Sequence, residues 1–144
     1  MRPAILGFTL LLAACISFPL DQPPEPVRDI DYTLATRADD SARKFHIELS
    51  SLTDRMLCFS SLDWPQDTGG WIGQQGLFIV RSPTRTLQPP DENPGSCAGP
   101  GCTMRIRPHR ILRATLNYGI FGSPGEVAAL DGKTLEYNLA VSSC

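Results

Sequence analysis

The sequence predicts an all-β fold, an immunoglobulin-like two-sheet sandwich of about seven strands over residues 30–144. Three observations favour this fold class. Apolar and polar residues alternate over short stretches, which is typical of strands that bury one face. Prolines and glycines separate these stretches, and no segment repeats its apolar residues at helical spacing. A small closed β-barrel is the alternative arrangement of the same strands.

Each expected strand is defined by its apolar positions. Phe45, Ile47 and Leu49 alternate with polar residues, whereas residues 77–80 form a compact apolar run. The expected strands lie at residues 30–34, 45–49, 57–59, 77–80, 104–107, 112–118 and 135–141. The pattern Phe-x-Ile-x-Leu, the later corner Ile106-Arg107-Pro108 and a strand ending near Tyr118 resemble bacterial immunoglobulin-like accessory and proteinase-inhibitor domains. This resemblance implies a sandwich fold and assigns no functional residue.

The N-terminus has the features of an export signal. Arg2 precedes a short apolar stretch, and the small residues Ala13 and Ala14 follow it. The tetrapeptide Leu12-Ala13-Ala14-Cys15 resembles the lipobox of bacterial lipoproteins. That resemblance implies removal of a signal peptide at residues 1–14 and acylation of Cys15, with an ordinary secretory signal as the alternative. Ile16 in place of an aspartate resembles lipoproteins sorted to the outer membrane, where the protein would face the periplasm.

Residues 15–29 predict a tether between the lipid and the domain. They contain four prolines and several acids, and proline-rich segments of this kind are extended and semi-rigid. Without Arg2 the mature chain has 12 Lys and Arg against 15 Asp and Glu, a formal charge of −3. An acidic balance argues against nucleic acid as a partner.

The remaining cysteines indicate two disulfide bonds. An even number of cysteines in an exported chain favours pairing, because that compartment is oxidising. Cys97 and Cys102 bracket a turn-rich Ala-Gly-Pro-Gly segment, so we expect them to pair and Cys58 to pair with Cys144. Zinc binding is the competing interpretation, but Cys58 and Cys144 lack neighbours at metal-ligand spacing.

The first candidate binding surface is the loop at residues 63–76, which contains both tryptophans. Trp64 and Trp71 are candidate partner-binding residues, because an exposed aromatic pair suits a protein or a sugar ring. The alternative is that both cap the open end of the sandwich. Asp63 and Asp67 offer too few oxygens for a calcium site.

The second candidate surface is basic. Four basic residues occupy odd-numbered positions, which places them on the solvent face of neighbouring strands, where they would attract an anionic partner. They are Arg105, Arg107, His109 and Arg113. Solvation of an ordinary strand face is the alternative. The loop at residues 82–103 is a third candidate, since a disulfide at its tip would preorganise it for binding.

No catalytic motif is found in the sequence. His46 and His109 have no local nucleophile motif, and neither a Gly-x-Ser-x-Gly nor a His-Glu-x-x-His pattern occurs. We therefore expect a protein that is not an enzyme and has no cofactor and no metal site. The expected function is that of a lipid-anchored envelope protein that inhibits or neutralises a hydrolase or toxin through its loops. A component of an envelope or secretion complex and a carbohydrate- or peptidoglycan-binding protein are the alternatives.

Overall fold

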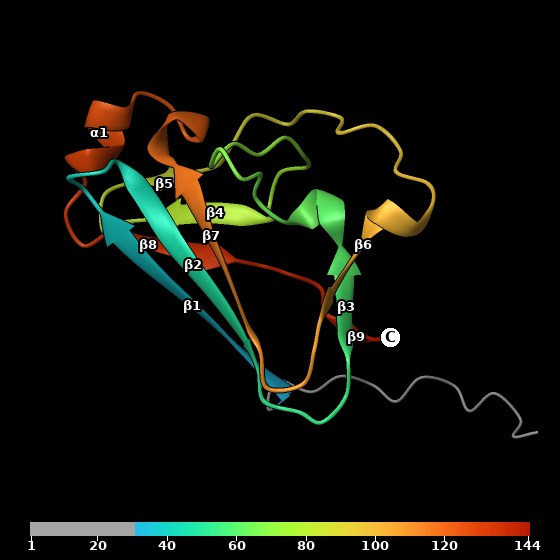
Figure 1. Cartoon of the computed structure of the whole chain (residues 1–144). Helices are drawn as coiled ribbons and strands as arrows, with labels where there is room; N and C mark the ends of the chain where they lie inside the picture. The colour runs from blue at the N-terminus through green and yellow to red at the C-terminus, as the bar shows by residue number, and fades with distance from the viewer. Residues whose placement is uncertain (1–30) are drawn as a thin grey trace, which may run out of the picture.

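The computed structural model describes residues 31–144, and this part of the chain has an all-β, sandwich-like fold (Figure 1). The predicted fold class is confirmed. The strands form three small antiparallel sheets. They are β1 (Tyr32–Asp39), β2 (Lys44–Ser51), β3 (Leu57–Ser60), β4 (Phe78–Arg81), β5 (Thr86–Leu87), β6 (Thr103–Ile106), β7 (Ile111–Asn117), β8 (Thr134–Tyr137) and β9 (Ser142–Ser143). The predicted signal peptide, Cys15 and the tether lie outside the described residues.

The first sheet has the order β1-β2-β7 and follows from the alternation in the sequence. Phe45, Ile47 and Leu49 are buried, while the residues between them are partly exposed. Period-two alternation is required here because successive side chains of a strand point to opposite faces. Asp39 closes the turn between β1 and β2, where its carboxylate accepts hydrogen bonds from Ser41 Oγ at 2.6 Å and Ala42 N at 3.0 Å.

The second sheet has the order β6-β3-β9 and is fastened by a disulfide bond. Cys58 in β3 pairs with Cys144 at the end of the chain, as expected, with Cα atoms 5.3 Å apart. The two-residue strand β9 has no sequence signal of its own, and it forms because this bond holds it against β3. The expected Cys97–Cys102 bond is also present, with Cα atoms 5.5 Å apart.

The third sheet has the order β5-β4-β8. Its central strand β4 buries three consecutive residues, which explains why residues 77–80 read as a continuous apolar run. No pattern in the sequence predicts β5 or the five-residue helix α1 (Pro124–Ala128), whose single buried residue is Val127. Short 3₁₀ turns η2 (Ser61–Asp63), η3 (Pro100–Cys102) and η4 (Tyr118–Ile120) complete the described elements.

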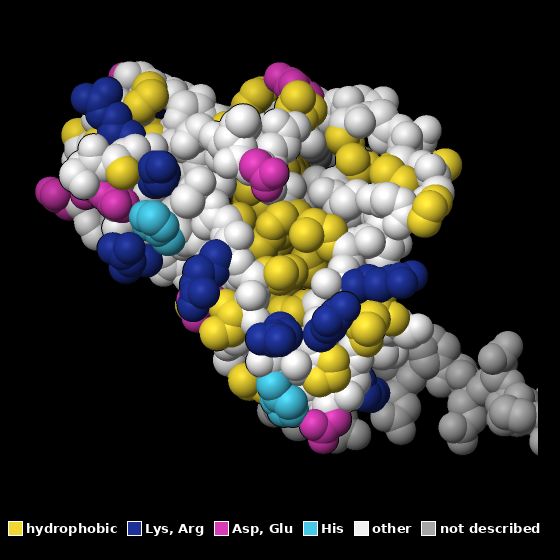
Figure 2. Space-filling view, viewed as in Figure 1, with side chains coloured by type: hydrophobic (Ala, Val, Ile, Leu, Met, Phe, Trp, Pro, Cys, Tyr) yellow, Lys and Arg dark blue, Asp and Glu magenta, His cyan; other side chains and the backbone are white. Residues whose placement is uncertain are grey.

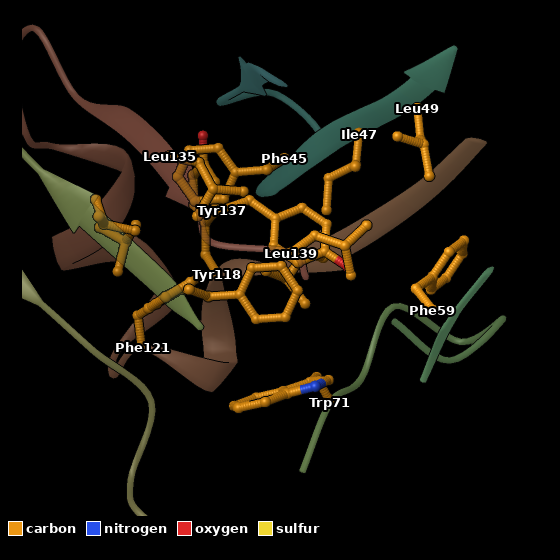
Figure 3. Close-up of a cluster of buried hydrophobic side chains, with 14 of the residues drawn as sticks. Phe45, Ile47, Leu49, Phe59, Trp71, Tyr118, Phe121, Leu135, Tyr137 and Leu139 are labelled. Carbon is orange, nitrogen blue, oxygen red and sulfur yellow. The ribbon is translucent and has the colours of Figure 1, made fainter. Parts of the chain in front are cut away.

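The three sheets enclose one hydrophobic core, which Figure 3 shows in close-up. Figure 1 shows β6 and β7 diverging from their shared turn, with β4 and β8 lying across the opposite end. Aromatic rings form much of the core. Phe78 packs against Tyr137 with ring centroids 4.3 Å apart, and Phe45 packs against Tyr118 at 4.8 Å. Such pairs contribute beyond their buried area, because ring edges and faces attract electrostatically.

A polar network anchors the chain after β7. Tyr118 is fully buried, and its hydroxyl donates to Asp40 Oδ1 at 2.7 Å. Lys133 Nζ lies 2.9 Å from the same carboxylate and donates to the carbonyls of Ala128 and Leu130. Burial, followed by the bond to Asp40, raises the pKa of the Tyr118 hydroxyl, so it remains a donor. The network joins the β1–β2 turn to the segment that follows α1.

Acid is expected to weaken this network. Hydrogen bonds from Lys133 and then Tyr118 hold the pKa of Asp40 below its ordinary value. A carboxylate with a depressed pKa in the folded state stabilises the fold above its unfolded pKa, and this contribution is lost as pH falls from about 5 toward the depressed pKa. Asp40→Asn should therefore lower the melting temperature near neutral pH and flatten its decline in acid. Melting curves of both proteins between about pH 7 and pH 3 test this, and parallel declines would contradict it.

Candidate binding groove

A groove is lined by one level of the first sheet and by the loop at residues 64–67. Thr36, Ile47 and Ala114 are aligned across β1, β2 and β7. On one side of them lies a row of three leucines (Leu34, Leu49, Leu112), and on the other a row that contains Phe45 and Leu116. Ile47 is only 1% exposed and the Thr36 hydroxyl donates to Leu135 O of β8 at 2.9 Å, so the inner face is covered at these two positions, whereas Ala114 on the outermost strand is half-buried. A groove of about 620 Å³ lies along this level of the sheet, and the neighbouring residues of all three strands also line it (Ala35, Arg37, His46, Glu48, Arg113, Thr115).

The groove is covered on one side by the segment Trp64–Asp67, which contributes to its lining. Trp64 is half-buried, and its ring lies 5.3 Å from Phe59 and 6.2 Å from Tyr137, measured between centroids. Pro65 is buried. The loop is pinned further along, where Gln66 N donates to Gly70 O at 2.9 Å. One wall of the groove is therefore a fixed aromatic and proline surface.

The other wall of the groove is an unpaired strand edge. Within residues 31–144, no strand pairs with β7 on the side away from β2. Arg110 O accepts from Ser51 N at 2.9 Å, so Arg110 and every second residue after it direct their backbone groups toward β2. The backbone groups of Ile111, Arg113 and Thr115 therefore face outward. Asn117 ends this free edge, because its backbone N donates to Gly69 O at 2.8 Å.

Figure 2 shows apolar side chains exposed between the positions of β7 and β6, with Lys and Arg side chains along the lower border. The strands and turn at this border carry four exposed arginines (Arg105, Arg107, Arg110, Arg113). Arg113 Nε donates to Glu48 Oε2 at 2.9 Å. No ion pair within residues 31–144 involves Arg105, Arg107 or Arg110. The lower border of this face is therefore positively charged, whereas Glu48 and Asp67 contribute carboxylates to the groove lining itself.

The predicted basic stripe is only partly realised. Arg105 lies on β6 and Arg113 on β7, but β6 pairs with β3 whereas β7 pairs with β2, so the two strands belong to different sheets. His109 is not on a strand. It has a left-handed backbone with φ of 54° in the turn, and its Nε2 lies 2.7 Å from Asp54 Oδ1. Pro108 and this turn break the register, so the arginines border the groove from two sheets.

The predicted aromatic platform of Trp64 and Trp71 is wrong. Trp71 is only 7% exposed, and its Nε1 donates to Leu62 O at 3.0 Å. Its ring packs against Phe78 with centroids 5.1 Å apart, and Figure 3 shows it among the buried side chains. The alternative interpretation, in which the tryptophans cover the core, describes Trp71. Of the two tryptophans, Trp64 is the one that lines the groove beside β7.

The loop at residues 82–103 projects its disulfide-closed tip into solvent. Cys97 is exposed, and Cys102 N donates to Gly99 O at 3.1 Å within the tip. The base of the loop is packed against the Trp71 segment, where Glu92 N donates to Gly73 O at 3.1 Å. Nothing brings this tip to the groove lining. The two candidate surfaces are therefore separate.

Acidic and metal-binding groups form no further site in residues 31–144. Asp63 is half-buried, and burial raises the pKa of its carboxyl group. No group of three or more His, Cys, Asp or Glu in this part of the chain is placed to hold a metal ion. No helix there is long and apolar enough to cross a membrane.

No family model, curated protein or solved structure matches this chain. The site must therefore be interpreted from its own geometry. The sequence pointed to Trp64 and to three of the four border arginines (Arg105, Arg107, Arg113), but it did not point to Arg110, Thr36, Ile47 or Ala114. One signal was present: the alternating inward positions of β7 read Leu-Ala-Leu at residues 112, 114 and 116, and a small residue between two large ones marks a depression.

Proposed function

We propose that this protein is a lipid-anchored protein of the bacterial cell envelope that binds a protein partner through the groove beside β7. The main observation that supports this proposal is the combination of a groove with a free strand edge. Concave apolar sites with a few polar groups are the usual places where ligands bind. The two disulfide bonds agree with an exported, oxidising environment. The lipobox-like tetrapeptide supports attachment at Cys15.

Binding at this groove suits either of two roles. An inhibitor would occlude the active face of a hydrolase or toxin, and the exposed tip at Cys97–Cys102 would supply a second contact, separate from the groove, that loses little entropy on binding because the loop is closed. An assembly component would instead extend a sheet of its partner through β7. Carbohydrate binding has weaker support, because buried Trp71 offers no face to a sugar ring.

Loss of the anchor is the first test. Cys15→Ser should move the full-length protein from the membrane fraction to the soluble fraction and abolish labelling by a radioactive fatty acid. Ser17→Ala, two positions further along, is the matched control and should leave both properties unchanged. Membrane retention of the Cys15→Ser protein with unchanged labelling would contradict lipid anchoring there.

Partner capture tests the binding function. Detergent-solubilised full-length protein, crosslinked in envelope extract, should retain a partner in a defined ratio. Charge reversal of Arg105 and Arg107 to glutamate should reduce that capture, while Arg85→Glu, in the turn between β4 and β5, should not. Capture of nothing by the wild-type protein would contradict the proposal. Loss of capture only on changing the 97–102 tip would move the interface to the loop.

A further inference from the structure

We infer that the groove accepts an extended acidic segment of the partner, which adds to the first sheet as a strand antiparallel to β7. This inference rests on the proposed function and specifies how its site works. It joins three observations: free backbone groups on β7, the groove next to them, and the arginines at the lower border of this face. In strand addition, main-chain hydrogen bonds supply affinity and pockets for alternate side chains supply specificity.

The backbone geometry determines which residues of the segment bond to β7. Ile111, Arg113 and Thr115 direct their N–H and C=O groups away from β2, so an added strand would exchange hydrogen bonds with these three residues. The bond from Asn117 N to Gly69 O blocks continuation beyond Thr115. The accessible edge is therefore short, and antiparallel addition matches the other pairings of this sheet.

The side chains of the added strand would alternate between two environments. A residue opposite Ala114 points to the inner face, where the part of the groove between Ala114 and Trp64 has room for an apolar side chain. Residues opposite Arg113 and Thr115 point to the outer face, as do Arg113 and Glu48. The segment must therefore alternate apolar residues, which enter the groove, with residues that point outward. The favoured charge of the outward residues depends on the charges around them.

The charge at the lower border of this face selects acidic residues for these outward positions. Arg105, Arg107 and Arg110 have no ion pair within the described part of the chain, whereas the nearby Asp54 is already bonded to His109. Opposite charges across neighbouring strands stabilise pairing, and like charges oppose it. A lysine-rich segment of the same apolar pattern should bind more weakly.

The most informative variant is one that fills the groove beside β7. Ala114→Leu fills the space that the segment's apolar side chain would occupy, and its larger side chain has room in the empty groove, so the fold should persist. Binding should weaken by about tenfold or more. Ala129→Leu is the matched control, because it makes the same change at an exposed position that follows helix α1 and does not line the groove.

The test uses a defined probe, a fluorescent synthetic peptide that alternates glutamate with valine, added to the full-length protein in detergent. It should bind, and a peptide with lysine in place of glutamate should bind about tenfold more weakly. Methylating the backbone nitrogens of the glutamates removes the donors to β7 and should abolish binding, whereas methylating those of the valines should not. Hydrogen exchange should slow at the amides of Arg113 and Thr115, while the amide of Ala114, already bonded to β2, should not change.

Each outcome is decisive. Absence of binding at about 1 mM peptide, equal effects of the two methylation patterns, or full binding by Ala114→Leu would overturn strand addition at β7. Slowed exchange at β6 in place of β7 would also overturn it, and so would occupation of the groove by a second copy of the chain, seen as a dimer by light scattering. If the envelope partner is captured by wild type and Ala114→Leu alike, the inference fails while the proposed function stands. If no partner is captured, the proposed function itself fails.

Discussion

Replacing Cys58 and Cys144 together with alanine is expected to lower the free energy of unfolding by about 4 kcal/mol. The bond joins residues 86 positions apart, so its loss greatly enlarges the conformational freedom of the unfolded chain. The same replacement frees β9, which has only two paired positions on β3. Urea unfolding of the double variant and the wild type measures the difference.

The second disulfide supplies the matched control for this prediction. Cys97 and Cys102 are five positions apart, and loop entropy assigns that shorter link only about 2 kcal/mol. The Cys97→Ala/Cys102→Ala variant should therefore be the more stable of the two double variants. Equal losses in both variants would show that the Cys58–Cys144 bond does not act through its long loop. Hydrogen exchange at the backbone amide of position 144, which in the wild type donates to Met56 O at 3.1 Å, reports release of the chain end directly.

Replacing Trp71 with alanine is expected to cost about 3–5 kcal/mol of stability, as large-to-small changes in a core do. The side chain is almost completely buried against Phe78, and its loss also leaves Leu62 O without its donor. Gly73 indicates how closely the ring is enclosed, because a Cβ at that position would lie 2.2 Å from Trp71 Cζ2. Thermal and urea unfolding measure the loss.

The neighbouring Ile72 provides the control. It is 49% exposed, and Ile72→Ala should change stability by less than about 0.5 kcal/mol. Trp71→Phe retains a ring and should fall between the two variants. At temperatures where Trp71→Phe is folded, it should bind the envelope partner as the wild type does. A folded Trp71 variant with lost partner binding would restore Trp71 as a contact residue.

Much of the fold could be predicted because alternation is a local property of the sequence. Phe45, Ile47 and Leu49 indicate both the strand and its buried face, without knowledge of any neighbour. β5 and β9 were not predictable in this way, because two-residue strands carry no periodicity and form only where a partner strand is already in place. Helix α1 is too short to show a helical stripe.

The candidate site, like the fold, could be predicted from the sequence only in part. Exposed arginines on alternating strands can be located from sequence, so Arg105 and Arg113 were found. That they belong to different sheets depends on pairing partners distant in the chain, which alternation does not specify. The groove depends on residues of β1, β2 and β7 lying at one level of the sheet, and that is a matter of register between three strands. The burial of Trp71 depends on packing against Phe78.

The sequence by itself determined the all-β class, the positions of the main strands and the pairing of the described cysteines. The strands follow from local alternation, and the pairing follows from the turn-rich segment between Cys97 and Cys102, which leaves Cys58 and Cys144 of the four cysteines after Cys15. It also carries the lipobox-like tetrapeptide on which the proposed anchor rests. Only the tertiary structure decided the three-sheet arrangement, the free edge of β7, the groove beside it and the burial of Trp71. The physical reason is that a local pattern fixes which face of a strand is apolar, whereas long-range pairing and packing fix what that face meets.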